Sequence, residues 1–113
     1  MKTQLYNYKA KIISIYDGDT VRMDISLGFN NWLLNQSVRL FGINTPEIRG
    51  SQKLDGLISR DRLRELIDGK EIILESHKDK TGKFGRILGT IYLDGVNINE
   101  LLVREGLAVR YLP

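Results

Sequence analysis

The stretch YKAKIISIYDGDTVRMDISL, residues 8–27, decides the fold. Residues 8–16 are rich in β-branched and aromatic side chains, which favour an extended strand. Residues 21–27 alternate apolar and polar side chains, the pattern of a strand that buries one face. Between them, the DGDT sequence of residues 17–20 predicts a tight hairpin turn, because Asp-Gly readily supplies positive φ angles. The stretch is therefore predicted to form an antiparallel hairpin with one face in the core.

Further segments of similar length follow along the chain. We expect, in order, a loop at 28–32, a strand over 36–41, a helix within 52–68, strands over 71–76 and 86–93, and a second helix after Asn97. Asn97 and Glu100 have the spacing of a capping box at the start of that second helix, and Gly106 ends it. Five strands with a helix after the third are typical of a five-stranded OB-fold barrel. The predicted class is therefore mainly β with helices (α+β).

The first expected helix has an irregular apolar pattern. At about 100° per residue, Leu63, Leu66 and Ile67 share a face with the small residues Gly56 and Ser59. The apolar residues nearer the start of the segment fall elsewhere on the helical wheel, which indicates a kink or a non-helical beginning. Gly69 suits the C-terminal cap of this helix.

Length and composition limit the possible functions. The 113 residues, of which 42% are hydrophobic, predict one domain over residues 1–113, since two cores would each be marginal at this length. The absence of cysteine rules out disulfides and thiolate catalysis, and the single histidine, His77, excludes multi-histidine metal sites. We expect His77 to be a surface residue without a role. Hydrolytic chemistry would therefore rest on carboxylates, arginines, hydroxyls and an oxygen-preferring metal.

Hydropathy and charge bear on location and partners. No apolar run approaches the roughly 18–20 residues of a membrane helix, so no membrane-spanning segment is expected. The first residues lack the apolar stretch of a signal peptide, so we expect an intracellular protein unless a signal lies outside the chain. The net charge of +3 mildly favours a polyanionic partner. Residues 78–86 hold four cations against one anion, which fits either a solvated basic loop or a loop that follows a phosphate backbone.

Three short segments place polar residues at the ends of predicted strands, and each also has an ordinary explanation. They are Asp17, Asp19 and Thr20; Arg39 with Asn44, Thr45 and Glu47; and Lys83 with Arg86. The DGDT sequence of 17–20 is either a simple turn or part of a metal site. Thr45-Pro46-Glu47 is either the start of a helical turn or a source of ligands and a carboxylate. Arg39 either lays its stem over the barrel or binds a phosphate.

The combination of these segments is far more specific than any one of them. Four blocks occur in order: YDGDTV (16–21), VRLFGINTPE (38–47), KFGR (83–86) and DGVNINELLVREGLA (94–108). In sequence and spacing they resemble the staphylococcal nuclease family, over about residues 8–111. The resemblance implies a single-domain OB-fold enzyme that hydrolyses phosphodiester bonds in DNA or RNA, with little base specificity and one calcium ion. It also implies attack on the 5′ side of the phosphorus, which leaves 3′-phosphate ends. We expect a monomer.

By match to the family motif, Asp19, Asn44 and the main-chain carbonyl of Thr45 take the places of the calcium ligands. Oxygen ligands of this kind are those that a hard cation requires. Asn44, however, stands where the family usually has an aspartate, so one negative charge is missing and a weaker calcium site is expected. This departure supports a rival interpretation, in which the chain is a catalytically weakened OB-fold module that binds nucleic acid.

The same match assigns the catalytic groups. Glu47 takes the place of the carboxylate that orients or deprotonates the attacking water, and Arg39 and Arg86 those of the two guanidiniums on the scissile phosphate. In-line attack on a phosphodiester builds negative charge on its oxygens, which bidentate guanidiniums and a divalent cation stabilise.

Three further residues are implied as contacts for the nucleic acid: Lys83, Phe84 and Tyr111. Phe84 stands where the best-known family member has a tyrosine, so the ring can still stack on a base but the hydroxyl is lost. Tyr111 is either a second ring near the base or plain packing.

Overall fold

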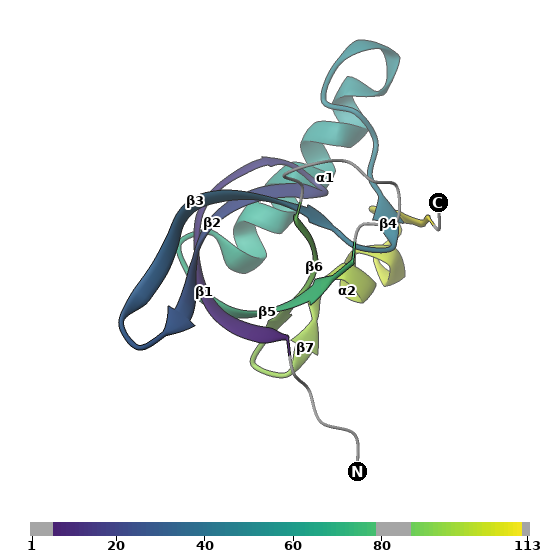
Figure 1. Ribbon diagram of the computed structural model, residues 1–113. Helices are drawn as coiled ribbons and strands as arrows, with labels where there is room; N and C mark the ends of the chain where they lie inside the picture. The colour runs from purple at the N-terminus through teal and green to yellow at the C-terminus, as the bar shows by residue number, and fades with distance from the viewer. Residues whose placement is uncertain (1–5, 79–86, 112–113) are drawn as a thin grey trace.

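The computed structural model describes residues 6–78 and 87–111. Its centre is a closed barrel of five long strands (Figure 1), namely β1 (Asn7–Asp17), β2 (Thr20–Gly28), β3 (Asn31–Leu40), β5 (Glu71–His77) and β6 (Ile87–Leu93). The order around the barrel is β3-β2-β1-β5-β6, with antiparallel neighbours, and a parallel pairing of β3 with β6 over Val38–Leu40 closes it. The predicted five-stranded OB-fold barrel is confirmed.

Two helices and three two-residue strands complete the described chain. β4 (Ile43–Asn44) pairs with β8 (Val109–Arg110), and β7 (Val96–Asn97) pairs with the end of β6. A 3-10 turn, η1 (Gly50–Gln52), leads into α1 (Lys53–Ile67), and α2 (Ile98–Arg104) follows β7. The expected helix within 52–68 is confirmed, but its predicted kink or non-helical beginning is wrong: α1 is helical from Lys53 onward, and Leu54 and Ile58 break the apolar pattern because they are exposed, 77% and 55%. None of the helices in the described ranges is long and apolar enough to cross a membrane.

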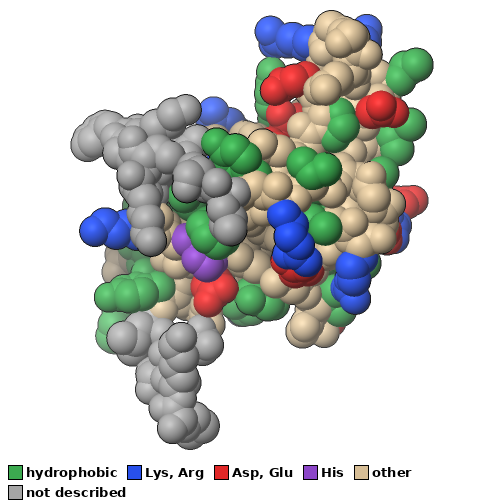
Figure 2. All heavy atoms as spheres, turned by 90° about the vertical axis from the view of Figure 1, so that its right-hand side faces the viewer, with side chains coloured by type: hydrophobic (Ala, Val, Ile, Leu, Met, Phe, Trp, Pro, Cys, Tyr) green, Lys and Arg blue, Asp and Glu red, His purple; other side chains and the backbone are tan. Residues whose placement is uncertain are grey.

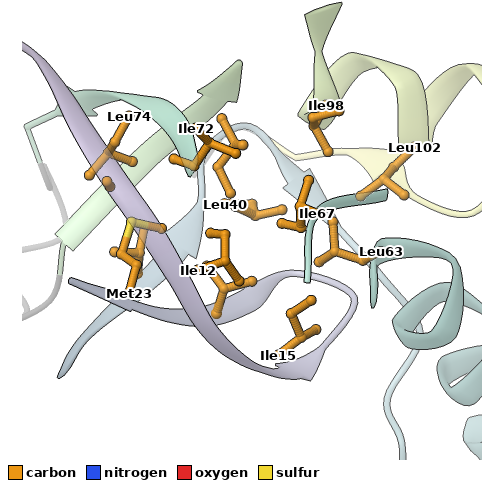
Figure 3. Close-up of a cluster of buried hydrophobic side chains, with 14 of the residues drawn as sticks. Ile12, Ile15, Met23, Leu40, Leu63, Ile67, Ile72, Leu74, Ile98 and Leu102 are labelled. Atoms are coloured by element: carbon orange, nitrogen blue, oxygen red, sulfur yellow. The ribbon is translucent and has the colours of Figure 1, made fainter. Parts of the chain in front are cut away.

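The apolar core lies inside the barrel and under both helices (Figure 3). Alternate residues of β1 and β2 point into it, including Ile12 and Met23, which are at most 1% exposed. Leu63 and Ile67 of α1 and Leu102 of α2 close one end of the barrel, each fully buried. The alternation that predicted the first hairpin therefore marks the residues that form this core.

The helix ends agree with the sequence in part. The buried face of α1 is Gly56, Ser59, Leu63 and Ile67, four of the five residues predicted for it, while Leu66 is partly buried against the core. Gly69 adopts φ +70° just past the end of the helix. The Asn97 side chain accepts from the Glu100 N–H at 3.0 Å, which confirms half of the capping box.

The reciprocal half of that capping box is wrong. The Glu100 carboxylate accepts two hydrogen bonds from the guanidinium of Arg110, each at 2.7 Å. A bidentate pair with a guanidinium is stronger than a single hydrogen bond to a backbone N–H, which explains why the Glu100 carboxylate binds Arg110 and not the Asn97 N–H. The pair links α2 to β8.

The expected loop at 28–32 is mostly strand, and this prediction is corrected. Phe29 and Asn30 both have positive φ, 53° and 62°, so the turn needs only two residues. β3 consequently starts at Asn31, five positions before the predicted start. The β2–β3 hairpin projects from the barrel (Figure 1), so its outer residues are exposed and carry no inside-outside pattern. The predicted strand over 86–93 is described from Ile87 onward.

Candidate active site

The turn between β1 and β2 forms one wall of the site. Asp17 pairs with Thr20 across it, as the predicted hairpin requires. Gly18, however, does not have a positive φ, so the reason given for this glycine from the sequence is wrong. A Cβ at position 18 would lie 2.8 Å from Cγ2 of Thr45 and 2.9 Å from Cβ of Ser59. Glycine is required here by close packing rather than by turn geometry.

Asp19 is the most enclosed carboxylate of the site, with its side chain 12% exposed. Its Oδ2 accepts from the backbone N–H of Thr45 at 3.0 Å, and its Oδ1 accepts from the Thr20 hydroxyl at 3.3 Å. Its own N–H donates to Oδ1 of Asp17 at 3.0 Å. The carboxylate therefore joins the β1–β2 turn to the segment after β4.

Arg39 faces this carboxylate from β3. It lies opposite Thr20 in the β2–β3 register, which brings its Nη1 within 3.5 Å of Asp19 Oδ2. Nη1 also donates to the Leu40 carbonyl at 2.9 Å, and Nη2 donates to Oδ1 of Asn44. With 19% of its side chain exposed, the guanidinium is held in one orientation and still reaches solvent.

Asn44 and Thr45 are placed by the short β4–β8 pairing, in which Asn44 lies opposite Val109. The amide oxygen of Asn44 is in contact with Arg39, and the Oγ1 atom of Thr45 is buried without a hydrogen-bond partner in the described structure. An unpartnered buried hydroxyl is costly, and a bound ligand or water would satisfy it.

Glu47 lies three residues after β4 and is exposed. Its backbone N–H donates to Oε1 of Gln52 at 3.2 Å, which connects it to η1. Its carboxylate is therefore carried by a short segment held between β4 and α1.

These residues share one open pocket of about 860 Å³. Its walls come from the β1–β2 turn, the end of β3, residues 44–47, the first turns of α1 and residues 106–109. The structure thus brings together Asp19, Arg39, Asn44, Thr45 and Glu47, five of the residues predicted from the sequence. Asp17 and Asp55 also line the pocket. The described lining therefore holds four carboxylates against a single guanidinium.

The pKa of Asp17 is raised from 3.8 to about 6. Burial is the main cause, because it disfavours the charged form, and the neighbouring Asp19 carboxylate adds to it through a hydrogen bond and charge repulsion. A cation in the pocket would relieve this repulsion.

The donor set fits a hard divalent cation. Asp19 supplies carboxylate oxygens, Asn44 an amide oxygen and Thr45 a main-chain carbonyl, beside the unpartnered Thr45 hydroxyl. Among the described residues, no three His, Asp or Glu side chains are grouped closely enough to hold a metal between them. A metal here would therefore depend on neutral oxygens as well as on Asp19.

Three predicted residues, Lys83, Phe84 and Arg86, lie outside the described residues. Tyr111 is described: its backbone N–H donates to the Gly42 carbonyl at 2.8 Å, and its side chain is 45% exposed. It follows β8 but does not line the pocket of Asp19 and Glu47.

Two polar features near the site were missed from the sequence. Asn99 of α2 is 3% exposed, and its amide bonds to the backbone of Phe41, Gly89 and Ile91. Asn99 belongs to the sequence block of residues 94–108. An asparagine in place of an apolar residue on the buried side of the predicted helix is the signal that could have identified it.

His77 is the second feature. The expectation that it has no role is wrong, because its ring stacks on Phe41 with centroids 4.0 Å apart and Nε2 lies 2.9 Å from the Thr90 hydroxyl. It also lies 3.5 Å from a Glu75 carboxylate oxygen. No sequence pattern places a strand-end histidine against a ring 36 positions away.

Charged side chains of both signs are interspersed on the face that carries β4 and the end of α2 (Figure 2). The described residues on this face form no continuous basic surface.

Comparison with known proteins agrees with the fold. Residues 37–112 match the family model described as staphylococcal nuclease homologue. An endonuclease from Escherichia coli is 33% identical over 104 residues, which are 89% of this chain and 60% of the relative. Two Bacillus subtilis (strain 168) proteins, the SPbeta prophage-derived endonuclease YokF and the endonuclease YncB, are each 32% identical over 81% of this chain.

The same alignments cover only part of those relatives. The chain spans 60% of the Escherichia coli relative, 43% of YncB and 30% of YokF. The family match itself extends over about two thirds of the present chain and contains the end of β3, both helices, β4 and the strands from β5 to β8. The chain belongs to the staphylococcal nuclease homologue family.

Proposed function

We propose that this protein is a calcium-dependent nuclease that hydrolyses phosphodiester bonds in DNA or RNA with little base specificity. The observation that carries the proposal is the single pocket that holds Asp19, Arg39, Asn44, Thr45 and Glu47. Relatives of comparable sequence are named endonucleases, which supports the reaction class.

The charge of the pocket supports the need for a cation. Four carboxylates and one guanidinium line its described part, so a phosphodiester anion entering alone would meet net repulsion. Asp19, Asn44 and Thr45 would hold a calcium ion, which when bound would neutralise this charge and polarise a phosphoryl oxygen.

Arg39 is placed to bind the phosphate. Its guanidinium is fixed by Leu40 and Asn44 and stays open to the pocket, so its remaining N–H groups can donate to a phosphate oxygen. A rigid donor aimed at developing charge needs no reorganisation as the reaction proceeds. Arg86 takes the second guanidinium role by resemblance.

Glu47 is the group that we assign to the attacking water. It is exposed at the pocket wall, so its carboxylate can accept a hydrogen bond and then a proton from water beside the phosphate. As the water oxygen bonds to phosphorus, the bond from phosphorus to the 5′ oxygen breaks and that oxygen leaves, while Arg39 at the pocket wall stabilises the negative charge that builds on the phosphoryl oxygens.

A rival candidate rests on one observation, the contact between Arg39 and the Asn44 amide. An aspartate there would add a charge to the cation site, whereas Asn44 leaves Asp19 as the charged ligand. In that case the chain would bind nucleic acid and cleave it slowly or not at all.

The test uses plasmid and single-stranded DNA, with calcium, with other divalent ions, or with chelator. We expect cleavage in calcium, loss of cleavage in chelator and loss of cleavage in Glu47→Gln. Glu65→Gln is the matched control, because Glu65 is an exposed glutamate of α1 outside the pocket. Retention of intact DNA on a gel without cleavage would support the binding module, and equal rates for wild type and Glu47→Gln would refute the role of Glu47.

A further inference from the structure

Two contacts hold the backbone of Glu47, and both come from the start of α1. The Glu47 N–H donates to Oε1 of Gln52 at 3.2 Å. Gly56 lies directly against the next peptide, between Glu47 and Ile48: a Cβ there would be 2.5 Å from the Glu47 carbonyl carbon, closer still to its oxygen, and 2.8 Å from the Ile48 nitrogen. Real Cβ atoms essentially never make contacts shorter than 3.0 Å, and backbone atoms cannot move aside cheaply. Glycine at position 56 therefore allows α1 to pack directly against the backbone of Glu47.

The same face of α1 meets the rest of the site one turn later. Ser59 is buried, donates from Oγ to the Leu107 carbonyl at 2.7 Å, and packs close to Gly18 and Thr45. In Figure 1 the chain leaves β4, rises away from the barrel and returns through η1 into α1. The first turns of α1 thus act as a platform for the segment that contains Thr45 and Glu47.

We infer that Gly56 and Gln52 are positioning residues for the Glu47 carboxylate. The inference rests on the proposed function, in which that carboxylate accepts the proton of the attacking water. Because the Glu47 side chain is exposed, its direction depends on the backbone that carries it, and these two contacts hold the peptides before and after its Cα. A misplacement of about 1 Å is enough to slow a positioned reaction by as much as about 100-fold.

The first variant is Gly56→Ala, which adds the Cβ that the Glu47 peptide excludes. Alanine forms helix better than glycine, so α1 is not weakened by propensity. We expect kcat on a single-stranded oligonucleotide to fall about 10- to 100-fold with KM nearly unchanged, and the urea midpoint to fall as well, because the Glu47 backbone must shift to admit the Cβ. The control is Gly69→Ala at the other end of α1, where φ is +70° and a Cβ meets open space. It should lower the urea midpoint and leave kcat unchanged.

A double-mutant cycle separates positioning from general damage. If Gly56 acts through Glu47, then adding Gly56→Ala to Glu47→Gln should lower kcat no further than about twofold. A full additional loss in the double variant, or wild-type kcat in Gly56→Ala alone, would overturn the inference. Wild-type activity in Glu47→Gln would instead refute the role of Glu47, and absence of cleavage by the wild type in calcium would refute the proposed function, so these failures are distinguishable from failure of the inference.

Gln52 supplies a second, milder test if Gly56→Ala folds poorly. Gln52→Ala removes the acceptor and should lower kcat about three- to tenfold, whereas Lys53→Ala, at the exposed neighbouring position, should not. Gln52→Glu keeps an acceptor oxygen and should restore most of the rate. Equal rates for the Ala and Glu variants would contradict the role assigned to this hydrogen bond.

Discussion

Replacing the buried Asn99 by leucine should destabilise the fold by about 1–5 kcal/mol. In the wild type its Oδ1 accepts from Ile91 N–H at 3.1 Å, and its Nδ2 donates to the carbonyls of Phe41 and Gly89 at 2.9 and 3.1 Å. Leucine has a similar shape, so little cavity forms. The Gly89 carbonyl keeps a second bond, from Phe41 N–H at 2.8 Å, whereas the other two groups lose the Asn99 amide.

The magnitude follows from those two orphaned groups. Each buried unsatisfied group costs roughly 1–3 kcal/mol, which gives about 2–6 kcal/mol. Burial of the leucine methyl groups offsets about 1 kcal/mol of this. A domain of this size has a total stability of roughly 5–15 kcal/mol, so the variant should lie near the limit of folding.

The assay is urea unfolding followed by circular dichroism, with Asn7→Leu as the matched control at an exposed position of β1. A loss below about 1 kcal/mol, or a loss equal to that of the control, would refute the reasoning. Asn99→Asp offers a second check. The new carboxylate keeps an acceptor for the Ile91 N–H but turns its second oxygen toward two carbonyl oxygens. Because these repel the charged form, the variant protein should be less stable at pH 7 than at pH 4.

Three further outcomes are expected. Arg39→Lys should lower kcat by about 100-fold or more with the fold intact, because one ammonium cannot replace a guanidinium held by Leu40, Asn44 and Asp19; near-normal turnover with an unchanged melting temperature would defeat the assigned role. Asn44→Asp should tighten calcium binding by roughly tenfold in calorimetry without nucleic acid, and an unchanged affinity would remove Asn44 from the ligand set. Asp17 has a folded pKa of about 6 against an ordinary 3.8, so its charged form disfavours folding: in chelator, wild-type stability should fall as pH rises from about 4 to 6 and then level off. Asp17→Asn should remove that dependence and be the more stable protein above pH 6, and parallel urea midpoints at every pH would contradict the cause given for the shift.

The barrel could be predicted because its strands carry a local signal. Alternation in β1 and β2 follows from one face being buried, and Gly69 and Asn97 mark helix ends by their own backbone preferences. The full length of the β2–β3 hairpin was not predicted, because both of its faces meet solvent near the tip. In addition, neither Phe29 nor Asn30 is followed by the glycine that signals a two-residue turn. The alternation of apolar and polar residues predicts a strand only where one face of that strand is buried.

The chemistry-bearing residues of the site were predictable by type and motif, but their arrangement was not. Asp19, Arg39 and Glu47 could be named from the sequence, whereas the contact of Arg39 with Asn44 depends on the register between β2 and β3 and on the β4–β8 pairing. The stacking of His77 on Phe41 depends on closure of the barrel between β3 and β6. Such contacts are set by the whole fold.

The irregular face of α1 has a physical explanation in the same arrangement. A helix that only covered a barrel would carry large apolar residues along its inner face, as Leu63 and Ile67 do in its second half. In its first half the inner face is Gly56 and Ser59, because there the helix packs against backbone, that of Glu47 and Leu107, rather than against core side chains. Large side chains at those two positions would strengthen the apolar contact and push the Glu47 segment outward. The weak amphipathic pattern is thus the consequence of one helix serving two purposes, closing the core with its end and supporting the pocket with its beginning.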